Sequence, residues 1–195
     1  MRPITQDEIQ NLQDYELSRP EFRARVIESK RRRRAALGPL MTLIFENRET
    51  VRFQIQEMLR VERIVQPAKV QHEIDTYNEL LPGEGQVAAT LFIEITDASR
   101  IQTVLDGFLG LEDPGHLRLR IGGTAHPALF APGQSRDDRI SAVHYIRFGV
   151  GDEGRAALSS GEPATLEVDH GDYHARQELS REAAEELIAD LSDAT

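Results

Sequence analysis

Residues 117–130 read Leu-Arg-Leu-Arg-Ile-Gly-Gly-Thr-Ala-His-Pro-Ala-Leu-Phe, and this stretch decides the fold class. Apolar and polar side chains alternate over residues 117–121, which is the period of a half-buried strand. Gly122-Gly123 suits a two-residue turn, because glycine readily adopts the positive φ angles that such turns need. The stretch therefore predicts a β-hairpin with strands at 117–121 and 124–130.

The same signals recur along the second half of the chain. A Gly171-Asp172 turn joins the expected strands 164–170 and 173–179 into a second hairpin. Further strands are predicted at 87–96 and 141–148, and helices at 97–109, 153–158 and 180–191. This order, β-α-β-β-β-α-β-β-α, is typical of a mostly antiparallel sheet with helices on one side, and it is compatible with a core that is ferredoxin-like in part.

The first half reads as helical, with one short strand. Helices are predicted from the Thr5/Glu8 capping box to about Leu17, from Pro20 to about Arg34, from Arg48 to Arg63, and from Pro67 onwards. A nearly continuous apolar run over residues 40–46 predicts a buried strand. The fold class is therefore α+β, with an N-terminal helical half docked on a mostly antiparallel sheet with flanking helices.

The stretch Leu-Pro-Gly-Glu-Gly at residues 81–85 is the best candidate boundary within the chain. It separates a helical segment with one buried strand, residues 1–80, from an α+β sheet domain, residues 86–195. Because the whole chain has 195 residues, we expect the two parts to form one compact unit.

Composition excludes several classes of site. The chain has no cysteine, which rules out disulfides, thiolate zinc sites, iron–sulfur clusters and a catalytic thiol. The first residues contain no apolar segment typical of a signal peptide, and no apolar run approaches the length of a membrane span. We therefore expect a cytoplasmic protein that does not bind membranes.

Charge is distributed unevenly around a net value of −10. Residues 1–80 carry 14 basic against 13 acidic side chains, whereas residues 81–195 carry 9 against 20. The basic run Lys30–Arg34 lies at the end of a predicted helix, where cations meet the negative end of the helix dipole. It could also dock an acidic partner. Nucleic acid is not an expected partner, because the chain as a whole is acidic.

The least ordinary stretch is the predicted helix 48–63. Its carboxylates Glu57 and Glu62 lie on faces that also carry apolar side chains, so they should be paired with arginines or bound to a ligand. One interpretation is an internal salt-bridge network that fixes the helix. The other is a polar pocket for a small anion or for acid–base chemistry, with the candidate residues Glu46, Arg48, Arg52, Gln56 and Glu57.

These segments carry a resemblance to a known family. The runs at residues 21–27, 43–63 and 138–143 resemble the bacterial family called "domain of unknown function 3501", and the similarity extends over essentially the whole chain. The family has no assigned activity. Its genes often lie beside rubrerythrin-like and heterodisulfide-reductase-like iron–sulfur proteins, so the resemblance implies a partner role in redox or peroxide handling. It assigns no functional residue.

The second hairpin contains an acid–histidine pair. The two-residue turn makes Glu167 oppose Arg176 and Asp169 oppose His174, so that all four side chains share one face. A solvated ladder of opposite charges explains this pattern. The alternative is a metal site in which Asp169 and His174 are two ligands, although a catalytic zinc usually needs three protein ligands.

Residues 149–154, Gly-Val-Gly-Asp-Glu-Gly, match the spacing G-x-G-x-x-G of dinucleotide-binding loops. Asp152 and Glu153 would place two negative charges where the pyrophosphate of the cofactor should lie. The strand that precedes the motif also alternates instead of being continuously apolar, as a buried parallel strand would be. We therefore expect no nicotinamide or flavin binding and assign no cofactor.

The sequence is compatible with three functions. The leading one is a binding or accessory protein that acts with a redox or iron partner protein and does not itself catalyse a reaction. The second is an enzyme whose polar pocket on helix 48–63 acts on a small anionic substrate, and the third is a metal-binding protein. A protein partner is expected, and a homo-oligomer stays open.

Overall fold

The computed structural model describes residues 1–136 and 139–193, the side chain of Asp193 excepted. Its centre is an eight-stranded antiparallel sheet in the order β1-β2-β3-β6-β5-β4-β7-β8. The strands are β1 (Arg34–Leu37), β2 (Met41–Glu46), β3 (Gln86–Ile93), β4 (Leu117–Ile121), β5 (Thr124–Phe130), β6 (Val143–Gly149), β7 (Ala164–His170) and β8 (Tyr173–Glu178). The α+β class and the antiparallel sheet are thus as predicted.

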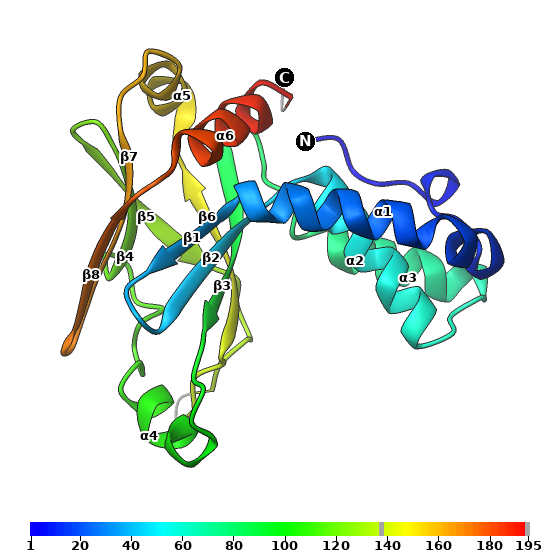
Figure 1. Ribbon diagram of the computed structural model, residues 1–195, viewed down its shortest axis with the longest axis horizontal. Coiled ribbons are helices and arrows are strands. Elements are labelled where there is room, and N and C mark those ends of the chain that lie inside the picture. The colour runs from blue at the N-terminus through cyan, green and yellow to red at the C-terminus, as the bar shows by residue number, and fades with distance from the viewer. Residues whose placement is uncertain (137–138, 194–195) are drawn as a thin grey trace.

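The sheet curls until its last strand returns to its first (Figure 1). The phenol of Tyr173 in β8 donates a hydrogen bond to the carbonyl of Leu37 and accepts one from the amide of Leu40. Every strand pair that the structure describes is antiparallel. A ferredoxin-like core contains adjacent parallel strands, so this curled sheet does not form one.

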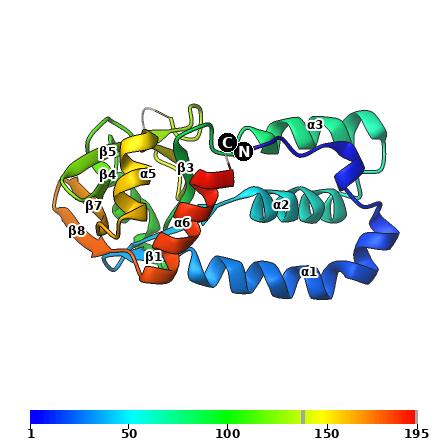
Figure 2. The ribbon, with the colours of Figure 1, turned by 90° about the horizontal axis from the view of Figure 1, so that it is seen from above.

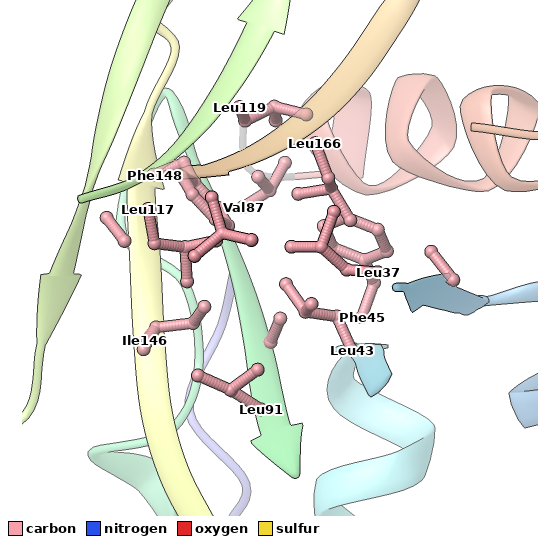
Figure 3. Packing of buried hydrophobic residues seen from close by; sticks show 14 of the residues in the cluster. Leu37, Leu43, Phe45, Val87, Leu91, Leu117, Leu119, Ile146, Phe148 and Leu166 are labelled. Atoms are coloured by element: carbon pink, nitrogen blue, oxygen red, sulfur yellow. The ribbon is translucent and has the colours of Figure 1, made fainter. Parts of the chain in front are cut away.

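The interior of the curled sheet is filled with apolar side chains (Figure 3). Alternation along the strands explains why: in β6, for example, His144, Ile146 and Phe148 are buried while the residues between them are more exposed. The labelled side chains in Figure 3 meet in one packed cluster: Leu37, Leu43, Phe45, Val87, Leu91, Leu117, Leu119, Ile146, Phe148 and Leu166. The interior is therefore a core, and a ligand has to bind elsewhere.

Short helices cover the two ends of the sheet (Figure 1). At one end lie α5 (Gly151–Ser159) and α6 (Arg181–Asp193), and the apolar side of α6 joins the core through Ala183, Leu187 and Leu191. At the other end lie η2 (Ala98–Arg100) and α4 (Ile101–Asp106). The side chain of Asp97 accepts a hydrogen bond from the amide of Ser99, so Asp97 is the predicted cap, but the helix ends earlier than predicted.

The helical part projects to one side of the sheet as three neighbouring helices (Figure 2). They are α1 (Leu12–Arg32), α2 (Arg48–Val61) and α3 (Pro67–Asn78), preceded by the short η1 (Gln6–Glu8). Helix α2 lies between the other two and contacts both of them. Apolar residues of α2 such as Val51, Ile55 and Leu59 pack toward α3 and the N-terminal segment.

Two predictions about the first half were wrong. Pro20 does not start a second helix but lies inside the single helix α1, whose buried residues Tyr15, Phe22 and Val26 supply packing that offsets the missing hydrogen bond. Strand β1 was not predicted. The helix predicted before it extends to about Arg34, which is the first residue of that strand. Together β1 and β2 place residues 34–46 in the same sheet as residues 86–178.

Candidate functional site

The five candidate pocket residues do not face a common pocket. Arg48, Arg52, Gln56 and Glu57 lie on α2, and Glu46 ends β2 just before that helix. Arg48 and Arg52 line one hollow, Arg52 and Gln56 line another, and Glu46 lines a third. The five residues therefore lie in different environments, and each makes its own contacts.

Glu57 holds α1 and α2 together. Its carboxylate accepts two hydrogen bonds from Arg19, at 2.7 and 2.9 Å, and one from the Tyr15 hydroxyl at 2.7 Å. The paired Arg19 guanidinium lowers the pKa of Glu57 to about 2. Burial, reinforced by the bond to Glu57, raises the pKa of Tyr15. The predicted pairing of Glu57 with an arginine is confirmed, whereas Glu62 lies just beyond the helix and is exposed.

Gln56 and Arg48 fix the N-terminal segment against α2. The buried amide of Gln56 accepts a hydrogen bond from the backbone N–H of Gln10 and donates one to its carbonyl. Arg48 donates to the carboxylate of Glu8 and to the carbonyls of Arg2 and Pro3. The donors and acceptors that could meet a ligand are thus largely used within the protein.

Glu46 has a different environment. Inward-facing Phe45 precedes it, so alternation places Glu46 on the outer face of the sheet, beneath the helical part. Its Oε1 accepts a hydrogen bond from Thr90 Oγ1 at 2.7 Å, and the nearest cation, Lys30 Nζ, lies 4.0 Å away. The side chain is only 3% exposed, yet Oε2 has no hydrogen-bond partner among the described residues.

Glu46 lines a groove of about 550 Å³ between the outer face of the sheet and the end of α3, here called the Glu46 groove. It is lined by apolar residues from the end of α3 and from β3, β5 and β6: Leu80, Ala88, Ala89, Leu129, Phe130, Ala131, Pro132 and Ile146. The side chains of Ala89, Phe130 and Ile146 belong to the core on the inner face, so Leu80, Ala88 and Leu129 supply the apolar side chains on the outer face. The polar residues of the groove are Glu46, Thr76, Glu79, Gln86, Gln134, Tyr145 and Arg147. Glu46 is therefore a deeply placed charge in a mainly apolar groove.

Tyr145 lies near Glu46, and hydrogen bonds hold two further polar side chains of the groove, Gln134 and Arg147, in place. Burial, and secondarily the Glu46 carboxylate, raise the pKa of Tyr145. The side chain of Gln134 accepts a hydrogen bond from the backbone N–H of Tyr145 at 2.8 Å. Arg147 donates to the carbonyl of Glu79, which ties β6 to the segment after α3. These residues were missed as site candidates, although alternation along β6 puts Tyr145 and Arg147 on one face.

The acid–histidine hairpin has the predicted register. Glu167 opposes Arg176, and Asp169 opposes His174 with an Oδ1–Nδ1 distance of 2.7 Å. The carboxylate of Glu167 also accepts one hydrogen bond from Arg118 and two from Arg120. No group of three or more histidine, aspartate or glutamate side chains placed to hold a metal occurs in the described part of the chain. The metal site at Asp169 and His174 stays a prediction.

The glycine motif lies where β6 turns into α5. The carbonyl of Gly85 accepts hydrogen bonds from the amides of Val150 and Gly151, at 2.9 and 2.8 Å. Because β6 pairs antiparallel with both β3 and β5, the motif does not belong to a βαβ unit, which the dinucleotide-binding loop requires. The motif is thus a turn that connects a strand to a short helix.

The basic run is largely paired within the protein. Arg33 is 2% exposed and donates to Asp190 and Glu186 of α6. Arg34 pairs with Glu94 at 2.9 Å. The expectation that Lys30–Arg34 forms a single stretch of helix was wrong, because α1 ends at Arg32 and Arg34 begins β1.

Comparison with known proteins gives a family and a similar solved structure. A family model described as "Protein of unknown function (DUF3501)" matches residues 3–191. The fold is similar to the crystal structure of a novel protein of unknown function from Burkholderia pseudomallei K96243, with 33% identity and a TM-score of 0.90. That similarity covers 97% of this chain and 100% of the other. No curated protein matches. No helix among the described residues is long and apolar enough to cross a membrane.

Proposed function

We propose that this chain, which belongs to the DUF3501 family of proteins of unknown function, is a binding protein whose Glu46 groove takes a small organic molecule with a protonated amine and an apolar body. The observation that carries the proposal is the Oε2 atom of Glu46, which is buried without a hydrogen-bond partner among the described residues. The amine of the ligand would be the missing donor.

Burying a carboxylate has a cost in free energy, and a ligand can offset it. An ionised carboxylate that leaves water loses several kcal/mol unless donors and a counter-charge replace its hydration. For Glu46, Thr90 supplies one donor and Lys30 lies at the outer limit of an ion pair, 4.0 Å away. A ligand ammonium group would supply both a donor and a charge, and such charge-assisted bonds are the stronger class of hydrogen bond.

The apolar wall supports the second half of the proposal. Leu129 of β5 and Ala88 of β3, with Leu80 after α3, offer surface to a hydrocarbon or aromatic body. A volume of about 550 Å³ lies in the range of sites for small ligands, which are typically apolar with a few placed polar groups. Binding without catalysis is the role that we propose, because the groove presents one anchoring charge and a wall for packing.

The test is calorimetric titration of the full chain with hexylamine, hexan-1-ol and hexanoate, which share one apolar body and differ in the head group. The proposal expects saturable binding of hexylamine by the wild type and little binding of the alcohol or the acid. Glu46→Gln keeps an acceptor for Thr90 but removes the charge, and it should weaken amine binding by about tenfold or more.

Glu94 provides a matched control. It accepts a hydrogen bond from Thr42 Oγ1 across two strands, just as Glu46 does from Thr90, but its side chain is 49% exposed. Glu94→Gln should leave amine binding unchanged. Equal binding of hexylamine and hexan-1-ol, or unchanged amine binding by Glu46→Gln, would overturn the proposal.

An accessory role with a redox or iron partner protein, as the family resemblance implies, remains a separate prediction. Arg31 and Arg32 are exposed members of the basic run, and their substitution leaves Arg33 and its bonds to Asp190 in place. Electrostatic docking predicts that a partner captured from lysate at low ionic strength is lost in the Arg31→Ser/Arg32→Ser variant. Arg181→Ser, on an exposed arginine of α6, is the control.

A further inference from the structure

We propose that a second hollow, at the start of α2, binds the phosphate group of a small phosphomonoester. The hollow has a volume of about 480 Å³ and is lined by Arg2, Asn47, Arg48 and Arg52, together with the acids Glu49 and Asp190. This inference does not depend on the Glu46 groove, which is lined by other residues.

Arg52 is the residue of this hollow whose guanidinium has no acidic partner among the described residues. Its guanidinium carbon lies 4.9 Å from the centroid of the Phe22 ring. Within residues 1–136 and 139–193, the guanidinium has no hydrogen bond or ion pair. Contact with the ring face restricts the guanidinium plane and leaves its N–H edges for an acceptor. Arg52 is therefore a cation held in place without its counter-ion.

The acids around the hollow already have cations of their own. The carboxylate of Asp190 receives two hydrogen bonds from Arg33, at 2.5 and 2.9 Å. Glu49 lies 3.7 Å from the guanidinium of Arg25, which is itself 5.4 Å from the centroid of the Phe22 ring. Glu8, which lines the adjoining hollow, receives Arg48. Arg52 is thus the cation that these pairs leave over.

Arg48 extends the cationic wall. It precedes Arg52 by four residues on α2, so the two side chains leave the helix on the same side. The bonds of Arg48 to Glu8 and to two backbone carbonyls fix its position. Arg2, whose side chain is 69% exposed, lines the same hollow and lies 3.4 Å from the carboxylate of Glu8, which Arg48 also contacts.

The ligand class follows from this arrangement. The fork of an arginine matches two oxygens of a phosphate, and a phosphomonoester carries close to two negative charges at neutral pH. Arg2 and Arg48 share the one carboxylate of Glu8, and Arg52 has none within the described part of the chain, so the wall keeps more positive than negative charge, which favours a dianion over a single carboxylate. Its volume exceeds that of a phosphate group alone, which leaves room for a small organic remainder.

The test uses calorimetric titration of the full chain with phenyl phosphate, inorganic phosphate and benzoate at low ionic strength. The proposal expects saturable binding of phenyl phosphate and weaker binding of benzoate, which keeps the ring but carries one charge. Arg52→Gln should lose about tenfold or more in affinity for phenyl phosphate, because one charge-assisted bidentate contact is removed. Arg52→Lys, which keeps the charge but not the fork, should also bind more weakly than the wild type.

Arg34→Gln is the matched control, since Arg34 is likewise partly exposed but pairs with Glu94 outside this hollow. It should bind phenyl phosphate like the wild type. Circular dichroism of Arg52→Gln must show the wild-type fold, so that lost binding reports the site. No saturable binding by the wild type up to about 10 mM ligand, unchanged affinity in Arg52→Gln, or benzoate binding as tight as phenyl phosphate would each overturn the proposal.

Discussion

The Tyr173 hydroxyl donates a hydrogen bond of 2.6 Å to the carbonyl of Leu37, although 136 residues separate them in the chain. The same oxygen accepts a hydrogen bond from the amide of Leu40 at 3.1 Å. One phenol therefore connects β8 to the turn between β1 and β2. Gly38 makes this approach possible, because its φ is +71° and a Cβ there would lie 2.5 Å from the Tyr173 oxygen.

Removing the Tyr173 hydroxyl should loosen this closure. Tyr173→Phe keeps the ring packed against Phe108 but leaves the carbonyl of Leu37 and the amide of Leu40 without their partner. We expect a loss of about 1–2 kcal/mol in the free energy of unfolding, measured by urea denaturation. Tyr77→Phe is the control, because the described residues give the Tyr77 hydroxyl no hydrogen bond. Equal effects of the two substitutions would contradict the assigned role.

Replacing Glu57 should destabilise the contact between α1 and α2. Glu57→Gln removes the charge that pairs with Arg19 and weakens the acceptor of the Tyr15 hydroxyl, which is buried. We expect a loss of about 1–2 kcal/mol, smaller than for a fully buried pair because water screens this one in part. Glu28→Gln, in the exposed pair with Arg31, should leave the urea midpoint unchanged.

Stability should fall in acid by way of Glu57 and Glu8. In the folded protein their pairing with Arg19 and Arg48 lowers the pKa of each to about 2, from an ordinary value of 4.5. Because these pKa values are lowered on folding, the ionised carboxylates stabilise the folded state at pH values above their unfolded pKa of 4.5. This stabilisation is lost as the pH falls toward 2. Urea midpoints measured between neutral pH and the acid range should show this decline.

The Glu57→Gln variant separates this contribution from other acid effects. The variant lacks the Glu57 carboxyl group, whose pKa is lowered in the folded protein. Its urea midpoint should therefore depend less on pH than that of the wild type over the same range. Parallel pH profiles for wild type and variant would show that Glu57 contributes nothing to acid sensitivity.

Arg33 should anchor α6 to the end of α1. Arg33→Ala removes the buried guanidinium that donates to Asp190 and Glu186, and breaking a buried pair in this way costs about 3 kcal/mol. Arg31→Ala, two residues earlier and exposed, should leave the thermal midpoint unchanged. If the two variants melt at the same temperature, the pairs made by Arg33 do not stabilise the fold.

Strand pairing in the second half followed from local patterns. The Gly122-Gly123 and Gly171-Asp172 turns fix which residues can oppose each other, so the registers of β4 with β5 and of β7 with β8 could be predicted. The pairing of β3 with both β2 and β6 joins distant parts of the chain, and no turn specifies it. Such contacts depend on how the whole sheet curls around its core.

In the first half, tertiary packing overrode local signals. A proline within a helical pattern ordinarily marks a helix start or a break, yet α1 continues through Pro20 because Phe22 and Val26 pack beneath it. Strand β1 is only four residues long and pairs with β2 alone in the described sheet order. A segment so short gives too weak a pattern for prediction.

For the candidate site too, the sequence identified some residues, whereas their neighbours became known only from the structure. The sequence identified Glu57 and Glu62 as unusual charges, because they stand beside apolar residues that have to be buried, and it named Glu46 and the arginines of α2 as candidate pocket residues. It could not show that Glu57 meets Arg19, 38 residues away, or that Glu46 lies near Thr90 and Tyr145. Those neighbours come from other elements.

By itself, the sequence determined the α+β class, the two hairpins and the presence of charged groups on the surfaces of elements that also carry apolar residues. These features depend on the period of side chains along one strand or helix and on the φ angles that a turn requires, which are local properties. Only the tertiary structure decided which charges are satisfied and which are left over. Arg33 and Arg52 are both arginines near one end of a helix, but Arg33 is buried against two acids and Arg52 faces a hollow. The difference arises from what packs across from each side chain, and long-range contacts alone supply that.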